Sequence, residues 1–173
     1  MTSSAGGSGR ILGGLRSADG KGVVRMEDRF STDIDDLWSA LTDPRRLARW
    51  LGDVQGDLRL GGEFRARFAA SGWEGTGRVD TCEPPRHLLV LTKDPDEPYE
   101  LVIEVTLTAD GDQTILVLEE RGMPPDLLAA YGAGIQVHVE DLAAHIAGQE
   151  RCDAQTRWNE LIPAYQDLAS SIS

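Results

Sequence analysis

Residues 30–64 constrain the possible folds more than any other part of this chain. Phe30 is expected to end a strand, and Thr32 with Asp35 fits the N-cap arrangement of a helix. The apolar residues that follow show the i, i+3, i+4, i+7 spacing of one helix face: Ile34, Leu37, Trp38 and Leu41. Pro44 suits the first turn of a second short helix that carries Trp50, and Gly61-Gly62 then turns the chain into a strand. Because the stretch contains no nucleophile constellation, phosphate loop or metal cluster, it favours a ligand container over a catalyst.

Strands are expected from residue 54 to residue 121, followed by helices. Residues 101–108 alternate between apolar and polar side chains, which is typical of a half-buried strand, and Asp110-Gly111-Asp112 is typical of a hairpin turn. The short connections indicate an antiparallel meander. Beyond a short piece broken at Gly132 and Gly134, an apolar stripe predicts a long helix up to Gly148.

The segments at the two ends are expected to lie outside the main domain. Residues 1–20 are rich in Gly and Ser and are predicted to be flexible, because they cannot bury enough apolar area to offset their ordering entropy, although Ile11, Leu12 and Leu15 could dock locally. The domain itself is predicted over residues 21–150. Residues 151–173 are expected to form a helical extension that is bent or interrupted by Pro163.

Length and charge narrow the classes of function. The 173 residues suffice for one domain, and the net charge of −12 argues against binding to nucleic acid or to an anionic membrane surface. No apolar run approaches the roughly 20 residues that span a bilayer, and the N-terminus lacks a secretion signal. Cys82 and Cys152 do not show metal-binding spacing. We therefore expect a cytoplasmic protein without cofactor, metal, disulfide or membrane insertion.

The order of the elements resembles the START-like (SRPBCC, helix-grip) superfamily. DIDDLWSALTDPRRLARWLG, residues 33–52, is similar to that superfamily's helix-turn-helix with its two tryptophans. Residues 60–64, 82–88 and 110–114 match strand and turn signals of the branch related to the activator of heat-shock-protein-90 ATPase. The resemblance covers about residues 22–148 and departs from the commoner pattern at Ile135, where an aromatic residue is often found.

The resemblance implies an α+β helix-grip fold, in which a curved antiparallel sheet wraps around a long C-terminal helix. It also implies an apolar cavity between the two. In this superfamily such cavities hold lipids, sterols, polyketides or aromatic hormones, and only some members are catalytic.

Inward-facing residues of the sheet and of the long helix are the candidates for binding a ligand. They are Phe64, Phe68, Trp73, Leu118, Glu120, Ile135, His138, Val139 and Leu142. For each of them the alternative is ordinary core packing. Gly75 and Gly77 share a face with Trp73, which either leaves room for a ligand or makes the bend of a curved sheet.

Polar residues on apolar faces are the candidates for chemistry. Asp28 and Glu120 could orient a ligand or act as acid–base groups, since burial raises a carboxyl pKa. Alternatively each lies near a strand end, hydrated or paired with an arginine such as Arg78 or Arg121.

The long helix carries a second polar set beside its apolar stripe: His138, Asp141 and His145. Asp141 and His145 could supply two metal ligands, but no third is evident. A structural or solvated role is the alternative, and a histidine that faced the cavity could hydrogen-bond a ligand.

Three hypotheses for the function follow. The first is a protein that binds a small hydrophobic or aromatic ligand between sheet and helix. The second is a cyclase/aromatase- or hydrolase-like enzyme that uses Glu120 or Asp28 beside the cavity. The third is a chaperone-ATPase-activator-like module that binds a protein partner with its exterior. A homodimer stays open as well.

Overall fold

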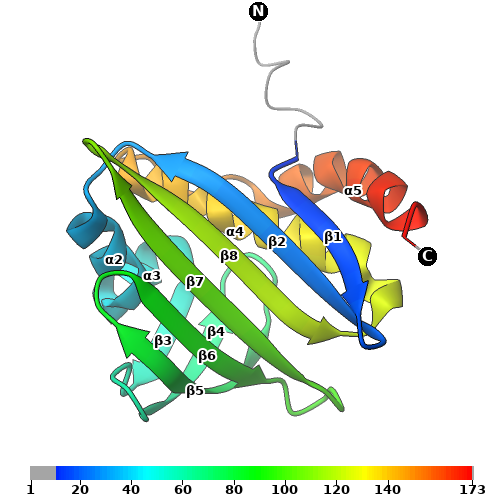
Figure 1. Cartoon of the computed structure of the whole chain (residues 1–173), viewed down its shortest axis with the longest axis horizontal. Helices are drawn as coiled ribbons and strands as arrows, with labels where there is room; N and C mark the ends of the chain where they lie inside the picture. Colours follow the sequence, from blue (N-terminus) through cyan, green and yellow to red (C-terminus); the bar gives the residue numbers. More distant parts are fainter. Residues whose placement is uncertain (1–10, 173) are drawn as a thin grey trace, which may run out of the picture.

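An eight-stranded antiparallel sheet forms the body of the computed structural model, which describes residues 11–172 (Figure 1). Its strand order is β1-β2-β8-β7-β6-β5-β4-β3, and every neighbouring pair runs antiparallel. The strands are β1 (Gly13–Ala18), β2 (Lys21–Phe30), β3 (Gly52–Gly56), β4 (Glu63–Phe68), β5 (Glu74–Glu83), β6 (His87–Lys93), β7 (Glu100–Asp110) and β8 (Gln113–Met123). The helices are α2 (Ile34–Thr42), α3 (Pro44–Trp50), the 3₁₀ turn η1 (Pro125–Leu127), α4 (Leu128–Ile146) and α5 (Ala154–Ser170).

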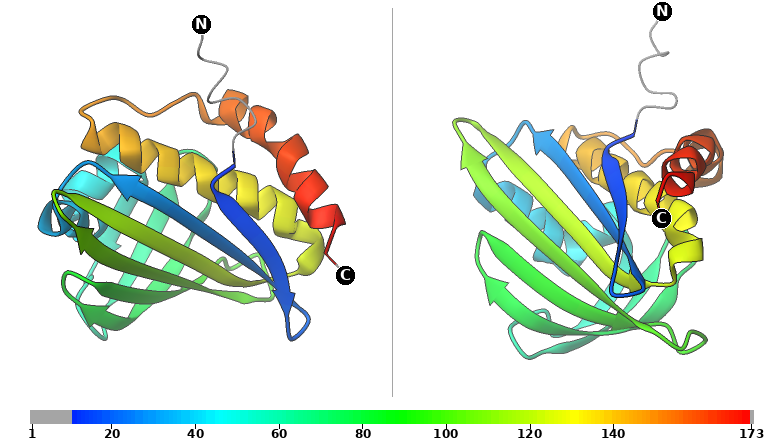
Figure 2. Two further views of the ribbon diagram at one scale, coloured as in Figure 1. Left: turned by 45° about the horizontal axis from the view of Figure 1, so that its top comes forward. Right: turned by 45° about the vertical axis from the view of Figure 1, so that its right-hand side comes forward.

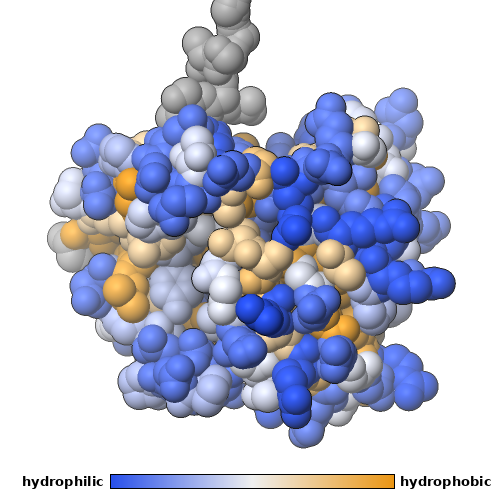
Figure 3. All heavy atoms as spheres, turned by 180° about the vertical axis from the view of Figure 1, so that it is seen from behind, coloured by the Kyte–Doolittle hydropathy of each residue, from blue (hydrophilic) through white to orange (hydrophobic). Residues whose placement is uncertain are grey.

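The sheet curves around α4, which lies along its inner face (Figure 2). This arrangement confirms the predicted α+β helix-grip fold. Strand β2 shows the alternation that places the core, because Val24, Met26 and Phe30 are buried against the helix side while Arg25 and Glu27 are exposed. On the helix side of the molecule, apolar side chains reach the surface between strongly hydrophilic ones (Figure 3).

Helices α2 and α3 fill one end of the sheet, and their start signals are local. The Asp33 carboxylate caps α2 by accepting from the Asp36 backbone N–H at 2.8 Å. The predicted cap, Thr32, was one residue too early; its hydroxyl donates to the Asp36 side chain instead. The Trp50 indole is 6% exposed and donates to the carbonyl of Ala40, which locks α3 onto α2.

The expectation that residues 1–20 form a flexible lead-in was wrong for their last part. Residues 1–10 lie outside the described residues, but Gly13–Ala18 form β1 and pair with β2. A buried side chain from α5 anchors the start of this strand, since the Tyr165 hydroxyl accepts from the Gly13 N–H at 3.2 Å. This long-range contact supplies the order that local composition lacks.

Helix α4 continues through Gly132 and Gly134, where the sequence predicts a break. The reason is tertiary packing: a β-carbon on Gly132 would lie 2.6 Å from the ring of Tyr165, so the missing side chain makes room for α5. Helix α5 is likewise continuous and contains Pro163 within it. In the described part of the chain, neither α4 nor any other helix combines the length and apolar character needed to cross a bilayer.

Candidate functional site

An apolar cavity of about 160 Å³, here called the inner cavity, lies between the sheet and α4. Eight of the nine residues predicted to bind a ligand line it: Phe64, Phe68, Leu118, Glu120, Ile135, His138, Val139 and Leu142. They come together because alternate sheet positions and one face of α4 point toward the same space. An apolar cavity of about 150 Å³ is large enough to hold a benzene molecule. Ligand binding by these residues stays a prediction.

A wider opening of about 640 Å³, here called the outer cleft, adjoins the inner cavity. The ninth predicted residue, Trp73, lines this cleft and stacks on Phe68 with 4.8 Å between ring centroids. The opposite side of the cleft comes from α4 and from Trp158 of α5. The C-terminal extension is therefore part of the site.

Six residues line both spaces and form what we call the neck: Phe68, Thr92, Ile103, Glu120, Ile135 and His138. Three of them carry polar groups in an otherwise apolar wall. The neck thus separates an apolar interior from a cleft that carries further polar side chains, including Asp94 and Glu97. A ligand with an apolar body and one polar group would match this arrangement, with its body in the inner cavity and its polar group at the neck.

Glu120 is an acidic side chain of the neck whose pKa burial shifts strongly. Its side chain comes from β8, opposite Ile103 of β7, and the residue is 8% exposed. Within residues 11–172 it has neither an ion pair nor a hydrogen bond through its carboxyl group. Burial therefore raises the pKa of Glu120 to about 7.

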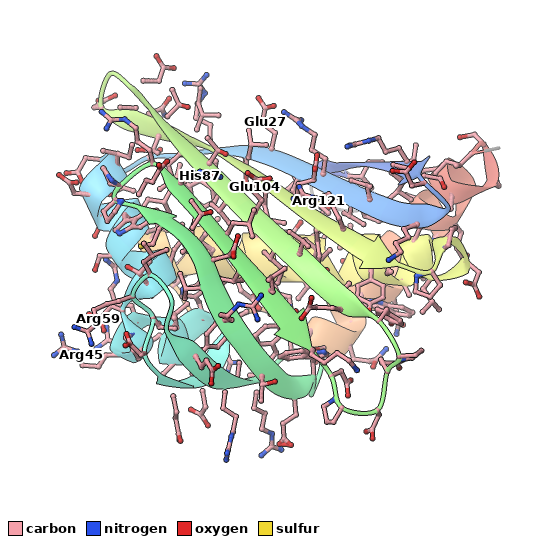
Figure 4. The ribbon with its side chains drawn as sticks, turned by 60° about the horizontal axis from the view of Figure 1, so that its bottom comes forward. Glu27, Arg45, Arg59, His87, Glu104 and Arg121 are labelled. Carbon is pink, nitrogen blue, oxygen red and sulfur yellow. The ribbon has the colours of Figure 1, made fainter. Side chains whose placement is uncertain are left out.

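The alternative that Arg121 neutralises Glu120 was wrong. Arg121 lies on the outer face of the sheet, where Figure 4 shows it near Glu104 and His87. Its guanidinium pairs with Glu104 at 2.9 Å and with Glu119 at 2.7 Å. The side chains of neighbouring residues in one strand point to opposite faces of the sheet, so Arg121 cannot form an ion pair with Glu120.

Thr92 and His138 complete the polar part of the neck. Thr92 is 3% exposed, and among the described residues its Oγ1 has no hydrogen-bond partner. The Nδ1 atom of His138 is also buried and without a partner in the same part of the chain. Burial lowers the pKa of His138 to about 4, so the imidazole is neutral at physiological pH. A buried polar atom without a hydrogen bond costs free energy, so Thr92 Oγ1 and His138 Nδ1 both favour a ligand that supplies the missing hydrogen bond.

Gly75 and Gly77 were predicted either to leave room for a ligand or to bend the sheet, and neither role fully explains why glycine stands at these positions. A β-carbon on Gly77 would lie 2.2 Å from the ring of Phe64, its cross-strand partner. A β-carbon on Gly75 would lie 2.6 Å from the indole of Trp73. The two glycines therefore admit aromatic rings that line the inner cavity and the outer cleft.

The remaining polar candidates lie away from the neck. Asp28 is partly exposed and accepts from the Arg29 N–H. Asp141 is buried beside the segment after α4, where its Oδ1 accepts from the Cys152 N–H at 3.0 Å. His145 contacts Arg46 through Nε2. Among the described residues, no cluster of three or more His, Cys, Asp or Glu side chains could hold a metal ion.

Sequence reasoning missed several residues of the site, among them Thr92, Tyr131 and Trp158. Thr92 could have been predicted from the sequence, because its two-residue spacing from Leu88 and Val90 puts it on the same inward face of the strand. Tyr131, whose hydroxyl lies 2.7 Å from that of Tyr99, was assigned to a separate short helix. Trp158 had no signal toward the site, because its place depends on how α5 docks on α4.

Comparison with known proteins adds to this geometry. Residues 31–147 match the model of the family described as Activator of Hsp90 ATPase homolog 1-like protein. The fold is similar to the crystal structure of CalU16 from Micromonospora echinospora, with a TM-score of 0.76 and 27% identity over 94% of this chain and 98% of CalU16. The solution structure of CalU16 gives a TM-score of 0.75 at 27% identity over 99% of both chains.

A third similar structure is that of DynU16, a protein in the dynemicin biosynthetic locus. Its TM-score is 0.69 at 30% identity, over 76% of this chain and 50% of DynU16. Among curated proteins, none matches the chain. The similarity to CalU16 extends beyond the family match at both ends, so it includes β1 and α5.

Proposed function

We propose that this chain, which belongs to the Activator of Hsp90 ATPase homolog 1-like family, binds a small apolar or aromatic molecule in its inner cavity. The observation that carries the proposal is the inner cavity itself, about 160 Å³ between sheet and α4 with an almost wholly apolar lining. Removing apolar ligand surface from water contributes about 25 cal/mol per Å². The polar neck would then orient the bound molecule.

The aromatic side chains leave this space open. Phe64 and Phe68 stand in the wall of the inner cavity, and Trp73 lies beside the outer cleft. Had these rings filled the interior, an exterior protein partner would have been the better hypothesis. The similarity to DynU16, a protein in the dynemicin biosynthetic locus, supports a ligand that is an intermediate or product of small-molecule biosynthesis.

Acid–base catalysis by Glu120 is the second candidate function. A carboxyl group with a pKa of about 7 is suited to proton transfer at neutral pH. In the described residues, however, no second side chain hydrogen-bonds to this carboxyl group. Binding without chemistry therefore accounts for the site with fewer requirements, and turnover that is lost in Glu120→Gln would favour the enzyme.

A cavity-filling variant tests the proposed function. Ala66 is 3% exposed and lines the inner cavity, so Ala66→Leu places three additional carbons there. The uncharged dye N-phenyl-1-naphthylamine is larger than the inner cavity, so a bound dye would also extend through the neck into the outer cleft. Followed by its fluorescence, it should bind the wild-type chain and bind Ala66→Leu at least about tenfold more weakly. Ala109→Leu adds the same atoms at an exposed position of β7 and should bind like the wild type.

Native mass spectrometry of the purified chain adds an independent measurement. A retained small molecule should appear as extra mass in the wild type and disappear in Ala66→Leu. Equal dye binding by all three proteins, or no binding by the wild type, would contradict a ligand in the inner cavity.

A further inference from the structure

The walls of the inner cavity and outer cleft carry charge of one sign. Three carboxyl groups line them, Glu120 at the neck and Asp94 and Glu97 at the mouth. Within residues 11–172, the linings of both spaces include no lysine and no arginine. His138 is the one imidazole in the described walls, and its lowered pKa leaves it neutral. An anionic ligand would therefore meet only like charge.

The ammonium group of Lys93 lies beside the mouth of the cleft but belongs to neither lining. Lys93 follows Thr92 in β6, so its side chain leaves from the opposite face of the sheet and lines a separate surface pocket. Its Nζ donates to the backbone carbonyls of Asp94 and Glu97, not to their carboxylates. The described ion pairs likewise include neither of these two carboxylates.

The buried carboxyl group at the neck supplies the second observation. Glu120 is more than nine-tenths buried, faces both spaces and is unpaired among the described residues. A buried carboxylate is strongly disfavoured unless a cation or several hydrogen bonds compensate it. Tyr131 also lines the outer cleft, and burial, Tyr99, Glu120 and Glu97 raise the pKa of its phenol. The missing group at the neck is thus a positive charge.

Aromatic rings mark the route to that position. Phe68, Trp73, Tyr131 and Trp158 all line the outer cleft. The faces of such rings attract an ammonium group, with tryptophan the most effective. At the neck, Thr92 Oγ1 and His138 Nδ1 are buried polar atoms without a hydrogen-bond partner among the described residues.

We propose that the ligand is a cationic amphiphile, with an apolar body in the inner cavity and a protonated amine paired with Glu120 at the neck. This inference rests on the proposed function and names the chemical class of its ligand. Neutral alcohols of the same shape bind more weakly, because they leave the carboxylate without a counter-charge. Carboxylic acids bind most weakly, because they add a second negative charge.

The test uses three probes that share one carbon skeleton: 4-phenylbutylamine, 4-phenylbutanol and 4-phenylbutyrate. Each displaces N-phenyl-1-naphthylamine from the full chain at neutral pH. The amine should bind at least about tenfold more tightly than the alcohol, and the acid more weakly than both. In Glu120→Gln, which keeps the shape and removes the charge, the amine should fall to the affinity of the alcohol.

Glu27→Gln is the matched control, since it makes the same Glu-to-Gln substitution on the exposed outer face of the sheet (Figure 4). It should leave all three affinities unchanged. Dye binding by Glu120→Gln checks that this variant retains the cavity. If the dye binds but the amine shows no preference, or keeps it in Glu120→Gln, the inference is wrong and the proposed function stands. If the wild type does not bind the dye, both fail.

Discussion

The pairing of Gly77 with Phe64 offers a quantitative test of how the cavity wall is built. Gly77 of β5 faces Phe64 of β4 in the sheet, and the ring occupies the space that a side chain would take. A β-carbon at Gly77 would lie 2.2 Å from Phe64 Cζ and 2.7 Å from Cε2. Ordinary carbon–carbon contacts are about 3.5–4.0 Å, so the ring must move by more than about 1 Å.

The sign of the effect follows from two opposing terms. Glycine within a strand costs about 0.5–1 kcal/mol relative to alanine, so Gly77→Ala would stabilise the fold if space were available. Overpacking of a tight site costs about 1–3 kcal/mol, which outweighs that gain. We expect a net loss of about 1–2 kcal/mol in the free energy of unfolding, or a decrease of roughly 2–8 °C in Tm.

Urea denaturation followed by tryptophan fluorescence measures this loss. Gly14→Ala is the matched control, because a β-carbon at Gly14 of β1 would meet nothing within 4 Å. That variant should be neutral or slightly stabilised. Phe64→Leu combined with Gly77→Ala should recover part of the loss, with a coupling energy of at least about 0.5 kcal/mol. A stabilised Gly77→Ala, or additive effects in the double variant, would contradict a steric conflict between position 77 and the Phe64 ring.

Two further predictions concern pH. The hydrogen bond between His87 and Glu104, at 2.6 Å, raises the pKa of His87. The stability that this interaction contributes is therefore fully present below about pH 6.5, and it is lost as the pH rises through the raised pKa of His87. His87→Gln should therefore destabilise the fold more at pH 5.5 than at pH 9 in denaturation curves, and an equal loss at both would contradict this. The buried carboxyl group of Glu120 lowers the free energy of unfolding as the pH rises from 4.5 to about 7, by at most about 3.5 kcal/mol. Glu120→Gln should therefore be more stable than the wild type at pH 8 and similar at pH 4, whereas a gain of the same size at both would contradict the assignment.

Much of the architecture could be predicted from local patterns. The alternation in residues 101–108 and the spacing of Ile34, Leu37 and Leu41 place these segments in β7 and α2. A similar alternation of apolar and polar side chains in β8 predicts that Leu118 and Glu120 face inward, and both line the inner cavity. Such patterns succeed where the periodicity of one element decides which side chains are buried.

The errors occurred where contacts between distant segments decide the structure. Gly132 looks like a helix breaker until Tyr165 packs against it, and residues 13–18 look unstructured until β2 and Tyr165 hold them. Trp158 belongs to the outer cleft because α5 docks on α4, which no local spacing indicates. Long-range packing of this kind overrides intrinsic propensity.

The most direct test of a ligand in the inner cavity is an NMR measurement of intermolecular NOEs between N-phenyl-1-naphthylamine and methyl-labelled protein. We predict NOEs from the dye to methyl groups that line this cavity, those of Leu118, Ile135, Val139 and Leu142. NOEs confined to exposed residues such as Leu60 would contradict it.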